Sequence, residues 1–238
     1  MELTDWLAIR GARKIVLTSR TGLRTGYQAL RIRLWRSYGA EVFISTQDVT
    51  TEQGIINLMN EAKALGPIDG IFNLAVVLRD AIFENQTEED FNISFGPKAV
   101  ATKLLDKVSR KMCPELSHFV IFSSVSCGRG NAGQTNYGMA NSVMERICEA
   151  RVQDGLPGLA IQWGAIGEVG LVAEMQEEHQ ELVIGGTLQQ TVSSCLECLD
   201  VFLKQKHPVV ASMVVAEKRA GGSGGGNIVD TVVNIMGK

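Results

Sequence analysis

The pattern with the clearest chemical meaning lies near the middle of the chain, in the stretch SSVSCGRGNAGQTNYGMAN. It places Ser124 thirteen residues before Tyr137, a spacing that is typical of sites that reduce carbonyl groups. A serine hydroxyl can hold a carbonyl oxygen, and a phenol can give that oxygen a proton as negative charge develops on it. The residue four positions beyond the tyrosine is Asn141, where such sites usually carry a lysine, so the positive charge must come from elsewhere in the chain.

The elements that must position these residues can be read from the hydrophobic pattern. Short segments rich in β-branched residues alternate with longer segments of helical periodicity. The short segments are nearly continuous apolar runs, as in parallel strands that are covered on both faces, so we expect an α/β fold with a doubly wound, Rossmann-like parallel sheet. Strands are predicted at 14–19, 41–46, 68–75, 118–124, 159–164 and 208–215, and helices near 2–10, 25–38, 51–65, 87–111, 134–153 and 187–204.

Composition excludes several classes of protein. With 238 residues, 45% of them hydrophobic, the chain can bury the core of one large domain. A net charge of -3 gives no electrostatic footprint for nucleic acid, and no apolar run is long enough to span a membrane. The first residues lack the basic and apolar regions of a signal peptide, and five cysteines, an odd number, suit a reducing compartment. These features predict a soluble, cytoplasmic protein.

A C-x-x-C pair, Cys195 and Cys198, could suggest a metal or redox site. The pair lies in a segment with helical apolar spacing, and no second pair of ligands follows it. We therefore expect two buried helix cysteines and no metal site.

Five motifs occur in a fixed order along the chain: LTSRTG (17–22), QDVT (47–50), NLAVVLRDA (73–81), the stretch quoted above and QWGAIGEVG (162–170). Together they resemble the β-ketoacyl reductase domain of animal-type fatty acid synthase. This domain belongs to the short-chain dehydrogenase/reductase superfamily and also occurs in polyketide synthases. The resemblance implies NADPH-dependent reduction of a β-ketoacyl thioester on acyl carrier protein to the 3-hydroxyacyl thioester. The implied partners are a carrier protein with a phosphopantetheine-bound chain and the remaining synthase domains; a polyketide synthase ketoreductase is the alternative.

The resemblance also indicates where the missing positive charge lies. In these carrier-protein-dependent reductases the lysine and the asparagine exchange places, and the matching residue here is Lys98. Tyr137 would be the general acid, and Ser124 would bind the same carbonyl oxygen. Lys98 would lower the pKa of Tyr137, which is otherwise about 10, and would hold the nicotinamide ribose. Asn141 would hold the Lys98 ammonium group or a relay water.

Further residues are implied to bind the cofactor. Arg20 matches the residue that pairs with the adenosine 2'-phosphate, and a guanidinium group at this position selects NADPH over NADH. The other matches follow the strands, at the edge where open α/β sheets bind ligands. They are Ser19, Asp48, Val49, Asn73, Ala75, Gly164 and Ala165.

The resemblance also predicts how the chain is divided. The sequence begins within the helix that should follow the first strand and its glycine-rich turn, so this strand and turn are expected to be missing. Segments 14–19 and 68–75 would then lie on either side of the place of the missing strand, and their backbone groups there would be unpaired. We expect a reductase domain over 1–217, a Gly/Ser-rich linker over 218–227 and the first helix of an acyl carrier protein over 228–238.

Two other functions remain to be weighed against the reductase. One is a non-catalytic fragment of such a synthase that cannot bind cofactor, because the pyrophosphate turn is expected to be missing. The other is a serine hydrolase, since Ser124 also ends a predicted strand. A nucleophile elbow requires G-x-S-x-G, and this motif is absent around Ser124, so the hydrolase is disfavoured.

Overall fold

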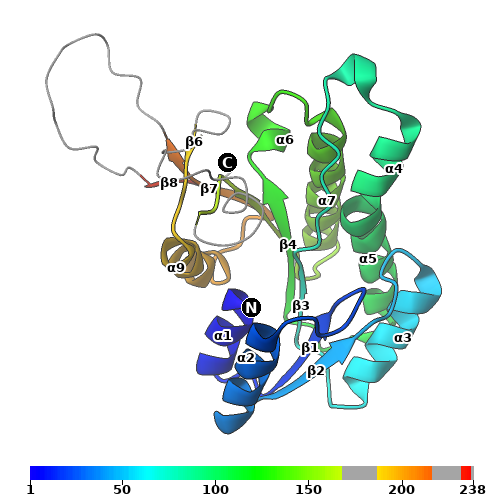
Figure 1. Ribbon diagram of the computed structural model, residues 1–238, viewed down its shortest axis with the longest axis vertical. Helices are drawn as coiled ribbons and strands as arrows, with labels where there is room; N and C mark the ends of the chain where they lie inside the picture. Colours follow the sequence, from blue (N-terminus) through cyan, green and yellow to red (C-terminus); the bar gives the residue numbers. More distant parts are fainter. Residues whose placement is uncertain (168–186, 216–231, 237–238) are drawn as a thin grey trace, which may run out of the picture. The chain divides into compact units, whose positions relative to one another are not determined.

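The computed structural model describes residues 1–167 and 187–215 and the backbone of 232–236 (Figure 1). The chain divides into two compact units, one formed by Met1–Ile71 with Val100–Ser117 and the other by Phe72–Ala99 with the residues from His118 onward. Parallel strands with flanking helices make up each unit. The α/β fold predicted from the sequence is therefore confirmed.

The first unit is built on a two-stranded parallel sheet. Its elements are α1 (Glu2–Ile9), β1 (Lys14–Thr18), α2 (Gly26–Ser37), β2 (Glu41–Ser45), α3 (Glu52–Lys63) and α5 (Ala101–Met112). Strands β1 and β2 pair from Lys14 opposite Glu41 to Thr18 opposite Ser45. Helix α2 begins at a capping box, in which Thr25 and Gln28 satisfy each other's backbone N–H groups. The local sequence thus fixes where the helix between the two strands starts.

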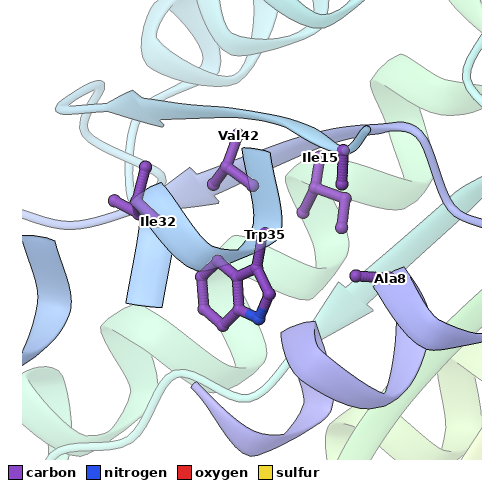
Figure 2. Close-up of a cluster of buried hydrophobic side chains, with 6 residues drawn as sticks. Ala8, Ile15, Ile32, Trp35 and Val42 are labelled. Carbon is purple, nitrogen blue, oxygen red and sulfur yellow. The ribbon is translucent and has the colours of Figure 1, made fainter. Parts of the chain in front are cut away.

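The core of the first unit surrounds Trp35 on α2. Figure 2 shows its indole among Ala8, Ile15 and Val42, which come from α1, β1 and β2. Trp35 is fully buried, and its Nε1 donates a hydrogen bond of 2.9 Å to Oδ1 of Asp5. One side chain therefore joins both helices to the sheet.

We expect Trp35→Phe to lower the free energy of unfolding by about 1.5–3 kcal/mol, because the carboxylate of Asp5 loses a donor and the ring loses volume. Denaturant titration measures this loss. Tyr38→Phe is the matched control, since Tyr38 is 51% exposed, and it should leave the midpoint unchanged. Equal midpoints for both variants would show that the indole contributes no more than a surface ring.

The second unit contains the larger sheet, with strand order β3-β4-β5-β7-β6 and with β8 paired to β7. Strands β4, β5 and β7 are parallel, whereas β6 and β8 run antiparallel to β7. Its elements are β3 (Gly70–Asn73), which enters from the first unit, the 3-10 turn η1 (Phe83–Asn85), α4 (Glu88–Phe95), the π-helix η2 (Gly96–Val100), β4 (His118–Ser124), α6 (Ser126–Arg129), α7 (Thr135–Gln153), β5 (Leu159–Trp163), β6 (Thr187–Leu188), α9 (Val192–Phe202), β7 (Val209–Val215) and β8 (Val232–Met236).

Helices cover both faces of this sheet, with α7 on one side and α9 on the other (Figure 1). Two consecutive residues of β5 show the alternation. Gln162 bonds to Glu145 on α7, whereas the ring of Trp163 lies 6.2 Å from that of Phe202 on α9. A strand with both faces buried produces the continuous apolar run from which it was predicted, so the doubly wound arrangement is confirmed.

The helix predicted over 87–111 is not continuous. It consists of α4, the π-helix η2 and α5. Pro97 has no backbone N–H and cannot donate to the preceding helical turn, so the regular hydrogen-bond ladder fails there. The amide of Asn73 donates to the Pro97 carbonyl at 3.1 Å. The interruption determines how the residues of η2 face the sheet.

The helix predicted over 187–204 begins later, at Val192, because the side chain of Thr191 caps it by accepting from the N–H of Ser194. Thr187–Leu188 instead forms β6. Cys195 and Cys198 are buried on α9, which confirms that they are buried helix cysteines.

The helix predicted over 228–238 is wrong for Val232–Met236, which forms strand β8. This stretch is rich in β-branched residues, and pairing with β7 gives its backbone groups hydrogen-bond partners. Within the described ranges, β1 pairs with β2 alone. None of the described helices combines the length and apolar character that a membrane crossing requires.

Candidate active site

The structure brings together the four residues predicted to do chemistry. Ser124 is the last residue of β4, while Tyr137 and Asn141 lie one turn apart near the start of α7. Lys98 lies in the π-helix η2. All four belong to the second unit, at the carboxyl end of β4, where open α/β sheets bind their ligands.

Lys98 is the most deeply buried charged group of this cluster, with 2% of its surface exposed. Its Nζ donates to the backbone oxygen of Phe122 at 3.0 Å and lies 5.0 Å from the centre of the Tyr137 ring. Burial lowers the pKa of Lys98 from 10.5 to about 8, because the charged form loses its hydration. The lysine is therefore still a cation at neutral pH and loses its proton in mildly alkaline solution.

Tyr137 differs from the expectation in its pKa. A lowered pKa was predicted, but burial raises it, and this outweighs the hydrogen-bonding contributions of Asn141 and Ser124, which lower it. The correction has a physical cause: Lys98 lies over the ring face and donates to Phe122, while the phenol itself is largely desolvated. Tyr137 thus keeps its proton at neutral pH and can act as a proton donor.

Asn141 does not hold Lys98, contrary to one of its two predicted roles. Its Nδ2 donates to the backbone oxygen of Tyr137 at 2.9 Å, and no hydrogen bond joins it to Lys98 in the described part of the chain. Its Oδ1 is buried and has no partner among the described residues. A buried acceptor without a donor is costly, so this atom is a natural binding point for a ligand or water.

Ser124 is oriented by the short helix that follows it. Its Oγ accepts a hydrogen bond of 3.2 Å from the backbone N–H of Ser126, the first residue of α6. The hydroxyl hydrogen can then point toward a carbonyl oxygen, as the predicted role requires. The sequence predicted no element between the strand over 118–124 and the helix near 134–153, so α6 was not foreseen.

One residue that sequence reasoning missed is Asn136, which is fully buried beside Tyr137. Its Oδ1 accepts from the N–H of Tyr137 at 2.7 Å, and its Nδ2 donates to the backbone oxygen of Arg79 at 2.8 Å. Gln86 strengthens the same connection by donating to the backbone oxygen of Gly133 at 3.0 Å. These amides tie the loop after β3 to the start of α7, and nothing in their spacing marked them in advance.

Among the predicted cofactor residues of the second unit, Asn73 and Ala75 have clear structural contacts. Asn73 accepts from the N–H of Ala75 at 3.1 Å and donates to Pro97, so it supports the turn that carries Lys98. Gly164 is required by packing, because a Cβ there would lie 2.9 Å from that of Met213. Ala165 is buried beside it.

The other cofactor candidates follow β1 and β2 in the first unit. The hydroxyl of Ser19 donates to the oxygen of Gly22 at 2.9 Å, and Arg20 is exposed. Asp48 accepts from both the hydroxyl and the N–H of Thr50, and these hydrogen bonds lower its pKa. Val49 is half-buried. Asp48 therefore has a turn-forming role, whereas Arg20 is open to an anionic ligand.

The chain is similar to known proteins in sequence and in fold. Residues 1–168 match the family profile described as the KR domain. A hybrid PKS-NRPS synthetase of Petromyces alliaceus is 34% identical over 171 residues, which cover 71% of this chain and 4% of that protein. A highly reducing polyketide synthase of Emericella nidulans is 34% identical over 200 residues, which cover 83% of this chain and 8% of that protein. The chain spans less than a tenth of these curated relatives.

A solved structure of A-type ketoreductases from a modular polyketide synthase aligns with this chain with a TM-score of 0.81 and 27% identity. The alignment covers 90% of this chain and 44% of that one. The likeness supports the Rossmann-like fold. These relatives are polyketide synthases, so the narrower resemblance to animal-type fatty acid synthase is corrected to a resemblance to the ketoreductase of polyketide synthases.

Proposed function

This chain belongs to the KR domain family, and from that premise we propose that it is the ketoreductase of a polyketide synthase. The substrate would be a β-ketoacyl thioester on the phosphopantetheine arm of an acyl carrier protein, and the product the 3-hydroxyacyl thioester. The carrier protein and the other synthase domains would be its partners. Residues 218–227 as a linker and 228–238 as the start of a carrier domain remain predictions under this proposal.

The observation that carries the proposal is the cluster at the end of β4. A protonated phenol at Tyr137, the hydroxyl of Ser124 and the buried cation of Lys98 lie within one unit. Reduction of a carbonyl requires a donor that holds the oxygen and an acid that protonates it. The arrangement provides both.

NADPH is the cofactor that we propose, and the groups at the site suit it. Lys98 carries three N–H donors, of which one is given to Phe122 within the described residues, and Asn141 presents a buried acceptor without a partner. Together they can bind the hydroxyl groups of a nicotinamide ribose. Bound NADPH would supply the hydride that reduces the carbonyl carbon. Arg20 would pair with the 2'-phosphate.

The chain's own residues would then handle the proton. Ser124 would donate to the carbonyl oxygen and fix its orientation, and Tyr137 would transfer its Oη proton to the same oxygen as charge gathers there. The hydrogen bonds of Ser124 and Asn141 favour the phenolate that Tyr137 leaves behind, because they lower its pKa. The charge of Lys98 would stabilise the phenolate further.

The test is oxidation of NADPH by the native protein in the presence of a β-ketoacyl thioester, followed by the loss of NADPH absorbance and by detection of the 3-hydroxyacyl product. We expect turnover that requires both substrates. A protein that neither bound NADPH nor reduced the thioester would favour the non-catalytic alternative, which cannot bind cofactor.

Cofactor choice gives a separate prediction. Arg20→Ala should weaken NADPH binding by about 1.5–3 kcal/mol and leave NADH binding nearly unchanged, because only NADPH carries the phosphate that the guanidinium would bind. Dissociation constants for the two cofactors measure the effect. Arg33→Ala is the matched control, since Arg33 is an exposed arginine on α2. Equal weakening of NADPH and NADH by Arg20→Ala would contradict the assignment.

A further inference from the structure

A buried carboxylate on α7 is not used by the proposed chemistry. Glu145 is 4% exposed and lies one helical turn beyond Asn141 and two beyond Tyr137, on the same face of the helix. A carboxylate pays several kcal/mol to leave water unless donors surround it. The hydrogen-bond donors around Glu145 therefore show how the loss of its hydration is compensated.

Three donors from three different elements meet at one oxygen of Glu145. Its Oε1 accepts from Ser123 Oγ on β4 at 2.5 Å, from Cys127 Sγ on α6 at 2.7 Å and from Gln162 Nε2 on β5 at 3.0 Å. The nearest described cation is Arg146, whose Nη2 is 4.0 Å from Oε2 and whose side chain is 63% exposed. The Glu145 carboxylate is thus held mainly by hydrogen bonds from neutral groups.

The sulfur in this cluster acts as a donor. Burial, together with Glu145, raises the pKa of Cys127 to about 12, so the thiol keeps its proton. Cys127 also lies 3.6 Å from Ser123 Oγ and accepts from Gln162 at 3.4 Å. The four side chains form one connected network, and breaking it would leave several buried polar groups without partners.

The network is adjacent to the residues of the candidate active site. Ser123 lies between Phe122 and Ser124 in β4. The backbone oxygen of Phe122 accepts the hydrogen bond from the Lys98 ammonium group. Glu145 therefore links two elements of the site. One is the end of β4, which contains Phe122 and Ser124, and the other is helix α7, which contains Tyr137. Ser123 also pairs with Gln162 across β4 and β5, so the carboxylate fixes α7 against both strands.

We propose that Glu145 is a positioning residue for the carbonyl-reducing site, which holds the end of β4 and helix α7 in the register that brings Ser124 to Tyr137. This inference deepens the proposed function and rests on it for its meaning. The contacts that carry it are the hydrogen bonds to Ser123 and Gln162. Positioning of this kind matters because displacements of about 1 Å can change rates by as much as 10²-fold.

The first test measures Tyr137 without using activity. The chain has three tyrosines, so ¹³C-labelled tyrosine gives few NMR signals, and that of Tyr137 is assigned with Tyr137→Phe. Ser124→Ala should raise the pKa of Tyr137, because Ser124 is one of the groups that lower it. Glu145→Met keeps the size of the side chain but removes the acceptor, and it should also raise the pKa of Tyr137. When Glu145→Met is combined with Ser124→Ala, the pKa of Tyr137 should be no higher than in Ser124→Ala alone.

Glu149→Met is the matched control, because Glu149 lies one turn further along α7 and pairs at the surface with Arg146. It should leave the Tyr137 signal as in the wild type. If Glu145→Met does not fold, Glu145→Gln serves instead, since its amide oxygen can still accept from Ser123 and should give a smaller change in the same direction. An unchanged or lowered pKa of Tyr137 in the folded variant would overturn the proposal, as would an additive effect with Ser124→Ala.

Rates in the native protein give the second readout. Glu145→Met should lower kcat by about 10-fold or more and leave the KM for NADPH within about twofold, because the misplaced groups act on the carbonyl. Parallel losses in kcat and in NADPH binding would point to a general structural role instead and would contradict the proposal. A wild-type protein that reduces no substrate would contradict the proposed function, while the NMR titration would still decide the role of Glu145.

Discussion

Replacing Tyr137 with phenylalanine is expected to lower kcat for a β-ketoacyl thioester by about 10³-fold. The change removes the hydroxyl and keeps the ring that lies beside Lys98. Burial raises the pKa of Tyr137, so the wild-type hydroxyl holds its proton at neutral pH and is ready to donate it. Without that donor, the carbonyl oxygen would have to take its proton from water.

Steady-state rates and NADPH binding should be measured together on this variant. We expect binding of NADPH to stay within about threefold of the wild type, because the loss lies in proton transfer. Tyr38→Phe, at an exposed tyrosine of the first unit, is the control and should show wild-type rates. A Tyr137→Phe variant that retained a tenth or more of the wild-type rate would show that another group is the acid.

The position of Tyr137 relative to Ser124 could be predicted from the sequence because both depend on local patterns. The run HFVIFSS forms β4 over the predicted residues, and the helix expected from position 134 begins at Thr135. A strand that ends at Ser124 and a helix that begins two residues before Tyr137 bring the two side chains to the same edge of the sheet. Spacing along the chain was therefore a sufficient guide to this part of the site.

The resemblance to carrier-protein-dependent reductases predicted that Lys98 belongs to the site. It did not predict the environment of Lys98. The sequence shows a proline after a glycine within an apparently continuous helical pattern, which signals a break but not its geometry. The π-helix also has a contact that is distant in sequence, since Asn73 donates a hydrogen bond to the Pro97 carbonyl. Burial of Lys98 and Tyr137 sets their pKa values, and burial is a property of the folded unit.

Long-range pairing explains what the sequence could not show. Glu145 reads as an ordinary helical glutamate, and its donors on β4, α6 and β5 become visible when the sheet is assembled. The segment Val232–Met236 has apolar residues that suit either a helix or a strand, and pairing with β7 decides for the strand. Both cases depend on contacts between segments that are far apart in the chain.

Lys98→Met is expected to lower kcat by about 10²-fold, because it removes the cation beside Tyr137 and a proposed ligand of the nicotinamide ribose. NADPH binding should weaken as well, which distinguishes this variant from Tyr137→Phe. Lys103→Met is the matched control, since Lys103 is an exposed lysine on α5. Rates for Lys98→Met that approached those of Lys103→Met would exclude a role for the buried cation.

The same substitution should change how stability depends on pH. The pKa of Lys98 is about 8 in the folded chain and 10.5 in the reference state, so between these values the unfolded chain binds more protons and stability rises with pH. The total rise is roughly 3 kcal/mol, and below about pH 8 the wild type bears the full cost of the buried charge. Lys98→Met should lack this rise. Denaturant titrations of both chains from neutral to alkaline pH isolate it as a difference, and parallel curves would mean that Lys98 is not desolvated. The charged, buried Lys98 lowers the free energy of unfolding at neutral pH. A residue that costs stability in this way is consistent with selection for catalytic activity rather than for stability.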